Sequence, residues 1–245
     1  MLKSNSGKVK YNVEGKPIYR ILNPSIKRLE KIQERIKTNI LDKLLLPDYA
    51  FGAVKKKDNV KNAKKHQGKK FKFVTDLKNF FPSISNKKVF EMFLSFDFSP
   101  TVSRKLTQLT TYKGKLPQGT QTSSAIANLV FIKTGKNLQN FAKENNITFT
   151  SFLDDLSFSS PIDFKDKTYT ILDIIKSDGF FISHKKTKYG VKAKITGLYP
   201  KQNYLDLPNS FKTKIKNVDG KTEEQIRGEK LYEEKVKKTN HKFVW

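Results

Sequence analysis

The sequence predicts an α+β fold in which a small antiparallel sheet packs against helices on one of its faces. Apolar residues recur every three or four positions in several segments, which is typical of amphipathic helices. In shorter segments apolar and polar residues alternate, which is typical of half-buried strands. The predicted order is strand, helices, hairpin, helix and strands, and this grouping indicates the α+β class.

The first helix is predicted over residues 26–44. Ser25 is placed to cap its N-terminus, and Pro47 is placed to end it. The same apolar spacing predicts five further helices: after Asn86, after Pro100, over about 123–143, through 171–175 to Gly179, and over 222–237.

The strands are predicted where aromatic or β-branched residues alternate with polar ones. Residues 71–77 read as one strand, and 147–160 read as a hairpin that carries Asp154 and Asp155 at its tip. Two short strands are predicted further on: 180–183 and 193–199.

The charge balance points to a polyanionic partner. The chain of 245 residues has 49 Lys and Arg against 23 Asp and Glu, spread along its whole length, and a formal net charge of +26. Such a surface attracts phosphate-bearing ligands, and nucleic acid fits it better than a membrane. The apolar stretches are too short to span a bilayer, and the start of the sequence has no apolar signal-peptide core, so we expect a cytoplasmic protein.

The absence of cysteine limits the metal chemistry that this chain can perform. With no Cys and only three scattered His, disulfides, thiolate zinc sites and histidine-rich sites are excluded or disfavoured. Any catalytic metal must therefore be bound by oxygen ligands.

Three aspartates provide a candidate set of such ligands. Asp76 ends the strand over 71–77, and Asp154 and Asp155 lie at the hairpin tip, so that the three can be neighbours in an antiparallel sheet. Carboxylates that close together repel one another unless a divalent cation such as Mg²⁺ or Mn²⁺ balances them. Two such ions can support phosphoryl transfer to a polymer end. The alternative is that the Asp-Asp pair only forms a turn, which is the commoner use of such residues.

Five segments of the sequence resemble, in order, motifs A to E of the reverse transcriptases. The segments are TDLKNFFPSI (75–84), LPQGTQTSSAIAN (116–128), FLDDLSFSS (152–160), GFFISHKKTKY (179–189) and ITGL (195–198). They are most similar to the prokaryotic branch that contains retron, group II intron and defence-associated enzymes. Upstream, KPIYRILNP, LEKIQERI and the Lys-rich segment before Phe71 look like the fingers of that branch.

The resemblance implies a right-hand polymerase with fingers, a palm in which an antiparallel sheet packs on helices, and a reduced helical thumb. Fingers would occupy residues 1–70, and the palm 71–200, with part of the fingers inserted over about 86–115. A reduced thumb and basic C-terminal segment would occupy 201–245. No maturase, endonuclease or ribonuclease domain fits in the remaining length, so the resemblance implies a stand-alone enzyme.

The resemblance also assigns the metal site and a general acid. Asp76, Asp154 and Asp155 would bind the metal ions, with the backbone carbonyl of Leu77 as an additional ligand. Lys186 matches the motif D lysine that protonates the leaving pyrophosphate, although the adjacent Lys185 is an alternative.

Leu77 and five further residues would bind the incoming nucleotide. Phe81 matches the aromatic residue that excludes a 2′-hydroxyl, although Phe80 and Phe81 can also be read as core. Gln118 would contact the nucleotide, and Gly119 would allow close backbone approach. Arg20 and Lys16 are candidates for the triphosphate.

Two further segments would hold the primer and template. Thr196, Gly197 and Leu198 align with the primer grip, and the basic stretch over 55–70 is a candidate phosphate-contacting surface. An RNA–DNA hybrid would be gripped through its backbone and shape.

The function implied is an RNA-directed DNA polymerase that uses Mg²⁺, with Mn²⁺ as a substitute, to add dNTPs to a 3′-hydroxyl. Its template would be a dedicated noncoding RNA, and its role would be phage defence. Whether it acts with a protein partner or with a second copy of the chain is left open. Two other classes remain open: a non-catalytic RNA-binding scaffold and a template-independent nucleotidyltransferase. An RNA polymerase with the same palm is a further alternative, which Phe81 disfavours.

Overall fold

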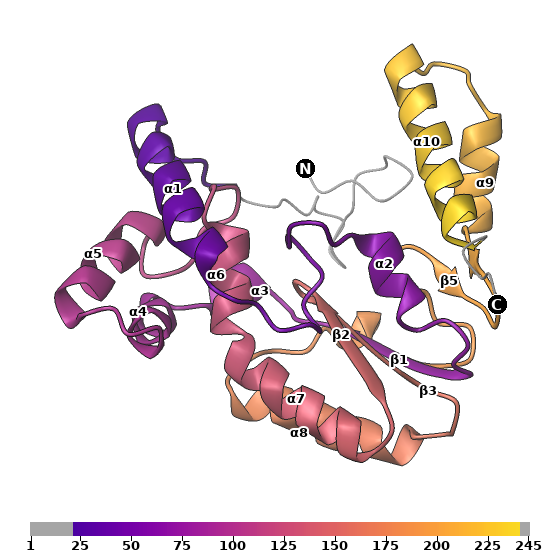
Figure 1. Cartoon of the computed structure of the whole chain (residues 1–245), viewed down its shortest axis with the longest axis horizontal. Coiled ribbons are helices and arrows are strands. Elements are labelled where there is room, and N and C mark those ends of the chain that lie inside the picture. The colour runs from indigo at the N-terminus through magenta and orange to yellow at the C-terminus, as the bar shows by residue number, and fades with distance from the viewer. Residues whose placement is uncertain (1–21, 241–245) are drawn as a thin grey trace, which may run out of the picture.

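A four-stranded antiparallel sheet lies at the centre of the chain (Figure 1). The computed structural model describes residues 22–240. The strand order is β2 (Thr148–Phe152), β3 (Asp155–Ser160), β1 (Phe71–Asp76) and β4 (Lys188–Gly190). No helix in the described range is both long and apolar enough to cross a membrane.

Helices cover both faces of this sheet, whereas the sequence predicted helices on one face. The aromatic rings of Phe73, Phe149 and Phe158 pack together and join α7 (Ile132–Glu144) and α8 (Thr168–Ser177) in the main apolar cluster. The opposite face carries small polar side chains of β2 and β3, and α2 (Asn59–Lys64) and the segment after it cover that face through hydrogen bonds. In Figure 1, α7 and α8 lie below the sheet and α2 lies above it.

A second group of helices packs beside the strand ends (Figure 1, left). Its members are α1 (Lys27–Asn39), α3 (Phe80–Ser83), α4 (Asn86–Ser95), α5 (Pro100–Thr110) and α6 (Ser123–Val130). The helices α4 and α5 begin where the sequence predicted, and Ser85 and Ser99 cap them with their side chains, whereas the short helix α3 was not predicted.

The first predicted helix is shorter than expected. It ends at Asn39, and a 3-10 turn over Leu41–Lys43 follows because Leu41 turns into the core. The Ser25 hydroxyl does not cap the helix but donates to Gln33 Oε1 at 2.7 Å, and Gln33 Nε2 donates to the Leu109 carbonyl at 2.8 Å. Ser25 therefore helps to join α1 to α5.

Three other predicted elements also differ from the structure. The helix over 123–143 is divided at Phe131, whose ring packs against Phe80 and Phe180. The strand over 180–183 is reduced to one bridge between Ile182 and Leu77. Residues 193–198 form a turn rather than a strand, and Lys188–Gly190 takes the edge position in the sheet instead.

The C-terminal part forms its own small apolar cluster. It contains the hairpin of β5 (Tyr199–Pro200) and β6 (Leu205–Asp206), followed by α9 (Asn209–Lys216) and α10 (Glu223–Asn240). The cluster joins these elements to α2 and to the turn before β5; its buried members are Val60, Ala63, Ile195, Leu198, Leu205, Leu207 and Val236.

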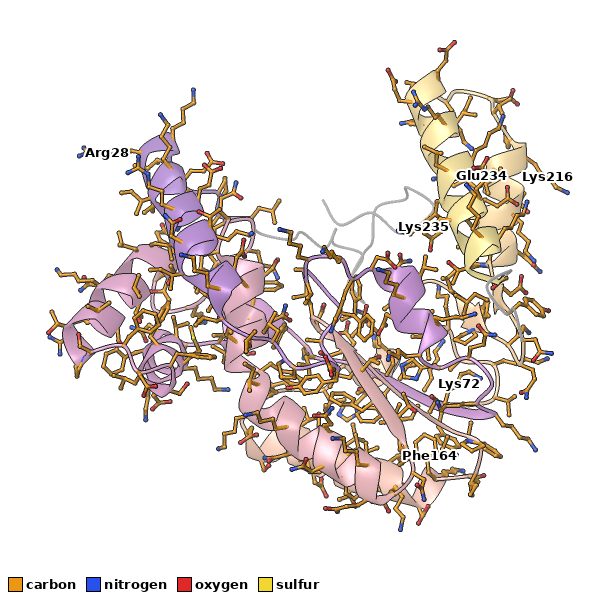
Figure 2. All side chains as sticks on the ribbon, in the orientation of Figure 1. Arg28, Lys72, Phe164, Lys216, Glu234 and Lys235 are labelled. Carbon is orange, nitrogen blue, oxygen red and sulfur yellow. The ribbon has the colours of Figure 1, made fainter. Side chains whose placement is uncertain are left out.

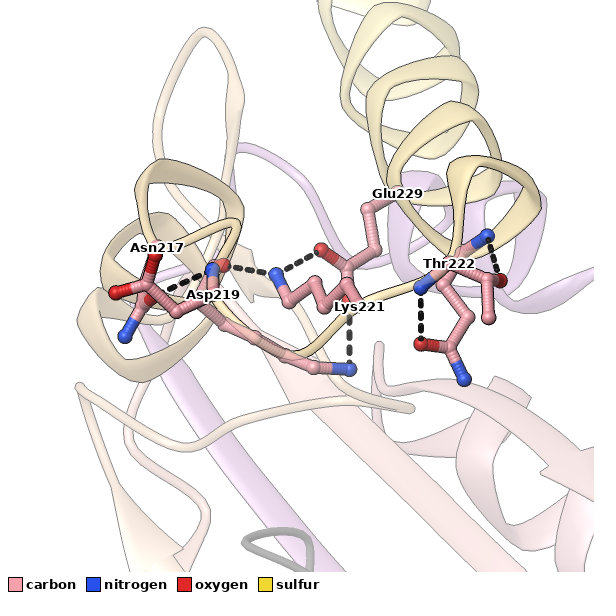
Figure 3. A network of polar contacts seen from close by, with 7 residues as sticks. Asn217, Asp219, Lys221, Thr222 and Glu229 are labelled. Carbon is pink, nitrogen blue, oxygen red and sulfur yellow. Dashed lines mark hydrogen bonds and ion pairs between the residues drawn. The ribbon is translucent and has the colours of Figure 1, made fainter.

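Polar contacts hold the two terminal helices together (Figure 3). Glu229 of α10 accepts from Lys221 at 2.7 Å and pairs with Lys214 of α9 at 2.8 Å. Thr222 and Gln225 exchange hydrogen bonds between side chain and backbone, which is the capping box that begins α10. The helix predicted over 222–237 is therefore present and extends to Asn240.

Candidate active site

The hairpin between β2 and β3 brings the three aspartates together at one end of the central strands. Antiparallel pairing places Asp76 opposite Asp155. Leu153 and Asp154 form the two-residue turn, in which Leu153 has a φ of 56°. The Leu77 amide donates to the Asp154 carbonyl at 2.9 Å, so that the turn is tied directly to the end of β1.

Gly52 lies against this turn, and sequence reasoning did not identify it. A Cβ at position 52 would come within 2.6 Å of the Leu153 backbone nitrogen, so only glycine fits there without a shift of the backbone. The Gly52 carbonyl accepts from Asn128 at 2.8 Å, and the Phe51 amide donates to the Ser151 carbonyl at 2.8 Å. These contacts fix the hairpin that carries Asp154 and Asp155 from outside the sheet.

Lys186 contacts the buried Asp76. Its Nζ lies 2.5 Å from Asp76 Oδ2, and Asp76 is 5% exposed. Loss of solvation alone would lower the pKa of Lys186, but the hydrogen bond to Asp76 and the nearby Asp154 and Asp155 carboxylates raise it. Both lysines of motif D are exposed, but Lys186 contacts one of the three aspartates, whereas the side chain of Lys185 has no hydrogen bond or ion pair within residues 22–240.

The surroundings of Asp155 disfavour the ionised form of its carboxyl group. Loss of solvation, followed by the Asp154 and Asp76 carboxylates, raises the pKa of Asp155 to about 6, although the Lys186 and Lys194 ammonium groups oppose the shift. An additional cation near these carboxylates would favour the ionised form.

The donor set fits a divalent cation bound through oxygen. In the described part of the chain, no group of three or more His, Asp or Glu side chains is arranged to hold a metal ion, and Asp76 is paired with the Lys186 ammonium. The Leu77 carbonyl accepts no hydrogen bond within residues 22–240 and lines the same cleft as Asp76 and Asp154. Carboxylate and carbonyl oxygens are the ligands that Mg²⁺ and Mn²⁺ prefer.

A cleft of about 800 Å³ opens beside the aspartates, which is within the range of small-molecule sites. Asp76, Asp154, Lys186, Phe81 and Gln118 all line it. The predicted catalytic and nucleotide-binding residues in the described range therefore share one cavity, with Asp155 and Gly119 next to residues that line it.

The two phenylalanines of motif A have different positions. Phe80 is 2% exposed and packs against Phe131 and Phe180, with ring centroids 6.0 and 5.7 Å away. Phe81 is half-buried and lines the cleft. Of the two readings of this pair, Phe80 is core and Phe81 borders the candidate site.

The segment around Gln118 approaches the described start of the chain. The Asn23 amide donates to the Gln118 carbonyl at 2.9 Å. Gly119 has a φ of 92°, a conformation that favours glycine. Arg20 and Lys16 lie outside the described residues.

A two-residue turn adds cleft residues that sequence reasoning missed. Tyr112 and Lys115 pair across Lys113 and Gly114, both of which have positive φ. Tyr112, Lys113, Lys115 and also Lys78 line the cleft. The Lys-Gly dipeptide was a turn signal, but no periodic pattern placed this turn near the aspartates.

The predicted primer-grip residues are not among the residues that line the cleft. Thr196 and Gly197, with φ of 42° and 94°, form a tight turn that is closed by two hydrogen bonds between Ile195 and Leu198. Asn59 Nδ2 donates to the Thr196 carbonyl at 3.1 Å, so that the turn is fixed to α2. Leu198 is fully buried in the C-terminal cluster.

A strand end and a hairpin tip place three carboxylates beside a cleft, an arrangement of oxygen donors that suits an enzyme of metal-assisted phosphoryl transfer. Residues 4–226 match the family described as reverse transcriptase (RNA-dependent DNA polymerase), and the chain belongs to this family. The resemblance found in the five motifs and the predicted α+β class are thereby confirmed.

The curated relatives include retron enzymes. Retron Se72 reverse transcriptase from Salmonella heidelberg (strain 579083-10) is 39% identical over 143 residues, which cover 58% of this chain and 38% of the relative. Retron Ec86 reverse transcriptase from Escherichia coli is 33% identical over 195 residues, which cover 76% of this chain and 60% of the relative. The chain thus spans about two fifths to three fifths of the length of these two relatives.

Among solved structures, telomerase from Candida albicans, in complex with a fragment of telomeric RNA, has a similar fold. The TM-score is 0.52 at 13% identity, over 70% of this chain and 36% of the telomerase chain. At that identity the similarity supports the fold alone.

Proposed function

We propose that this chain is an RNA-directed DNA polymerase that extends a 3′-hydroxyl with deoxynucleotides. The observation that carries the proposal is the β1–β3 register, which sets Asp76 opposite Asp155 at the mouth of a cleft that Phe81, Gln118 and Lys186 also line. Membership in the reverse transcriptase family supports the same reaction.

Asp76, Asp154, Asp155 and the Leu77 carbonyl would hold two Mg²⁺ ions, with Mn²⁺ as a substitute. Bound there, such ions would lower the pKa of the attacking hydroxyl and would neutralise the charge that develops on the phosphates. The protein holds these oxygens at fixed places through the hairpin pairing and the Leu77–Asp154 hydrogen bond.

The remaining cleft residues would act on the nucleotide directly. Lys186 is held protonated by Asp76, so it can donate a proton to the leaving pyrophosphate. The Phe81 ring would exclude a 2′-hydroxyl by steric contact, and Gln118 would hydrogen-bond the nucleotide. Arg20 and Lys16 remain candidates for the triphosphate, and Thr196, Gly197 and Leu198 for the primer.

The finer parts of the proposal concern partners and organisation. The template would be a dedicated noncoding RNA, because the relatives are retron enzymes. A role in phage defence, a protein partner, action as a stand-alone enzyme and a cytoplasmic location belong to the same proposal. The boundaries 1–70, 71–200 and 201–245 for fingers, palm and reduced thumb also belong to the proposal, and the smaller apolar cluster would join residues of all three parts.

Primer extension tests the reaction directly. The wild-type protein, with its copurified nucleic acid retained, is supplied with labelled dNTPs or NTPs and Mg²⁺ or Mn²⁺, beside Asp155→Asn and Asp76→Asn. We expect dNTP incorporation that both variants lose while RNA binding is retained, since the ligand change alters the metal site and not the basic surface. Asp173→Asn, which changes an exposed acid on α8, is the matched control.

Three outcomes would contradict the proposal. Full activity in both ligand variants would exclude the metal site. Tight, salt-sensitive RNA binding without incorporation by the wild type would favour a binding scaffold. Products whose sequence does not follow the RNA would favour a template-independent nucleotidyltransferase.

A further inference from the structure

Four lysines gather at the end of the sheet that is remote from the aspartates. Lys65 follows α2, Lys69 lies in the next loop, Lys72 is in β1, and Lys201 follows β5. The Gly68 amide donates to the Lys201 carbonyl at 3.0 Å, which joins the two segments of the chain. We call these four residues the sheet-end lysines.

Backbone contacts hold the sheet-end lysines in place. Lys72 is 3% exposed, and its Nζ donates to the carbonyls of Lys69 at 2.7 Å and Val191 at 3.3 Å. Lys69 Nζ donates to the Lys65 carbonyl at 3.4 Å. The positive charges are therefore attached to a fixed part of the fold rather than to a free tail.

No carboxylate pairs with the sheet-end lysines within the described residues. Burial and the Lys65 ammonium lower the pKa of Lys69, and burial and the Lys201 ammonium lower the pKa of Lys72. The lysines of the terminal helices differ, because several have acidic partners: Lys212 with Asp206, Lys214 and Lys221 with Glu229, Lys235 with Asp58, and Lys237 with Glu233.

The position of the cluster relates it to the candidate active site. Lys72 and Asp76 lie on the same strand, about 13 Å apart at about 3.3 Å per residue. Figure 2 shows Lys72 at the end of the sheet away from the α1 and α5 helices. A nucleic-acid duplex carries about one charge per 1.7 Å of its axis, so RNA that leaves the cleft can present several phosphates at that distance.

We propose that Lys65, Lys69 and Lys201 form a second phosphate-binding surface, which holds RNA beyond the duplex in the catalytic cleft. The inference rests on the proposed function, in that the RNA is the template or its flanking structure. Lysine is depleted from the cores of protein–protein interfaces, whereas phosphate contacts are its usual role. Double-stranded RNA is bound through phosphates and 2′-hydroxyls, which requires no pocket at this surface.

The test compares two RNAs and two triple variants of the full chain. One RNA is a short RNA–DNA hybrid that fills only the cleft, and the other is the same hybrid continued by an RNA stem. The first variant carries Lys65→Gln, Lys69→Gln and Lys201→Gln, and it leaves Lys72 unchanged because its ammonium caps buried carbonyls. The control variant carries Lys136→Gln, Lys143→Gln and Lys165→Gln, which remove the same charge at exposed positions outside the 55–70 stretch.

Binding is measured from about 50 to 200 mM KCl, and the slope of log Kd against log[KCl] counts phosphate contacts. We expect the slope for the extended RNA to fall by about two to three in the first variant and to stay unchanged in the control, because each contact contributes about 0.7–0.9. The slope for the short hybrid should be the same in all three proteins.

Equal slopes for the extended RNA in wild type and first variant would overturn the proposal. Equal slopes together with a loss of polyglutamate binding would assign the surface to an acidic protein segment instead. Primer extension on the short hybrid distinguishes failure of this proposal from failure of the proposed function. If no nucleotide is incorporated but the slopes of wild type and first variant still differ, the polymerase function is overturned and the RNA-binding surface is not.

Discussion

The two adjacent lysines of motif D differ in their contacts with the candidate site. The sequence left Lys185 and Lys186 as alternative proton donors. Lys186 contacts Asp76 at 2.5 Å, whereas the side chain of Lys185 has no such partner within the described residues. The difference follows from the short 3-10 turn over His184–Lys186, which no apolar periodicity indicates.

Lys186→Gln is expected to lower kcat by about 10²- to 10⁴-fold, the usual contribution of a positioned general acid. The KM for dNTP should change little, and the fall in wild-type rate at high pH, where Lys186 loses its proton, should disappear. Lys185→Gln is the control and should leave both parameters unchanged. Equal effects of the two substitutions would contradict the assignment.

His66 provides a residue-scale prediction about stability. It is fully buried, and its ring nitrogens lie 2.7 Å from Ser159 Oγ and from Thr150 Oγ1. Burial, followed by the Lys69 and Lys72 ammonium groups, lowers the pKa of His66 from 6.5 to about 3. Below pH 6.5 the unfolded chain therefore binds a proton that the folded protein excludes, and stability falls as the pH falls toward about 3.

The free energy of unfolding should decrease by about 1.4 kcal/mol per pH unit below 6.5 from this residue alone, or about 2 kcal/mol between pH 7.5 and 5. Urea titrations at the two pH values measure it. His66→Gln, which can still hydrogen-bond but does not titrate in this range, should lose this part of the pH dependence. His184→Gln, at an exposed site, should keep it.

At the scale of elements, α2 connects parts of the molecule that are remote in sequence. Asn59 Nδ2 donates to the Thr196 carbonyl at 3.1 Å and to the Tyr232 hydroxyl at 2.6 Å. Asp58 caps α2 through the Lys61 amide and pairs with Lys235 of α10 at 2.9 Å. One short helix thus joins the turn over 195–198 to the terminal helices.

Tyr232→Phe should loosen α10 without disturbing the sheet, because it removes the hydroxyl but keeps the ring that packs on Phe211. We expect faster amide hydrogen exchange in α10 and shorter products per binding event, with single-nucleotide addition little changed. Tyr169→Phe, at a residue that is 75% exposed, is the control. Unchanged exchange in α10 would show that the hydrogen bond does not restrain the helix.

Sequence patterns correctly predicted the helices and strands that bury one apolar face. They failed where contacts with distant segments determine the position or the end of an element. The strand over 71–76 and the hairpin were predicted because aromatic residues alternate along them. The break at Phe131 depends on aromatic partners that come from other segments. The three aspartates were predicted from their place at strand ends together with the resemblance of the surrounding motifs, whereas Gly52 and Tyr112 reach the candidate site through loops whose positions no local pattern encodes.

Residues 22–240 contain two apolar clusters of unequal size. The larger surrounds the central sheet, and the smaller joins α2 and the 195–198 turn to β6 and α10. Because few apolar residues hold the terminal helices, we expect them to open at a lower free energy than the sheet.

Leu205→Ala, which truncates a side chain 2% exposed in the smaller cluster, should destabilise that cluster by about 2–5 kcal/mol. Hydrogen exchange should accelerate in α10 and leave the protection of β1 and β3 unchanged. Leu138→Ala, at a fully buried residue of the larger cluster, should reduce protection throughout the chain. A uniform change in both variants would indicate one cooperative unit.

The pairing of β1 with β3 has a consequence for how such chains can evolve. The same register places Phe73 against Phe158 in the core and Asp76 opposite Asp155 at the edge. If one residue were inserted into or deleted from either strand, the side chains on one side of that point would move to the opposite face of the sheet. The pairing that buries Phe73 and Phe158 would then no longer place Asp76 opposite Asp155. Natural variants should therefore keep the lengths of these strands invariant and gain or lose residues in the connection over 161–167, where the chain is mostly exposed.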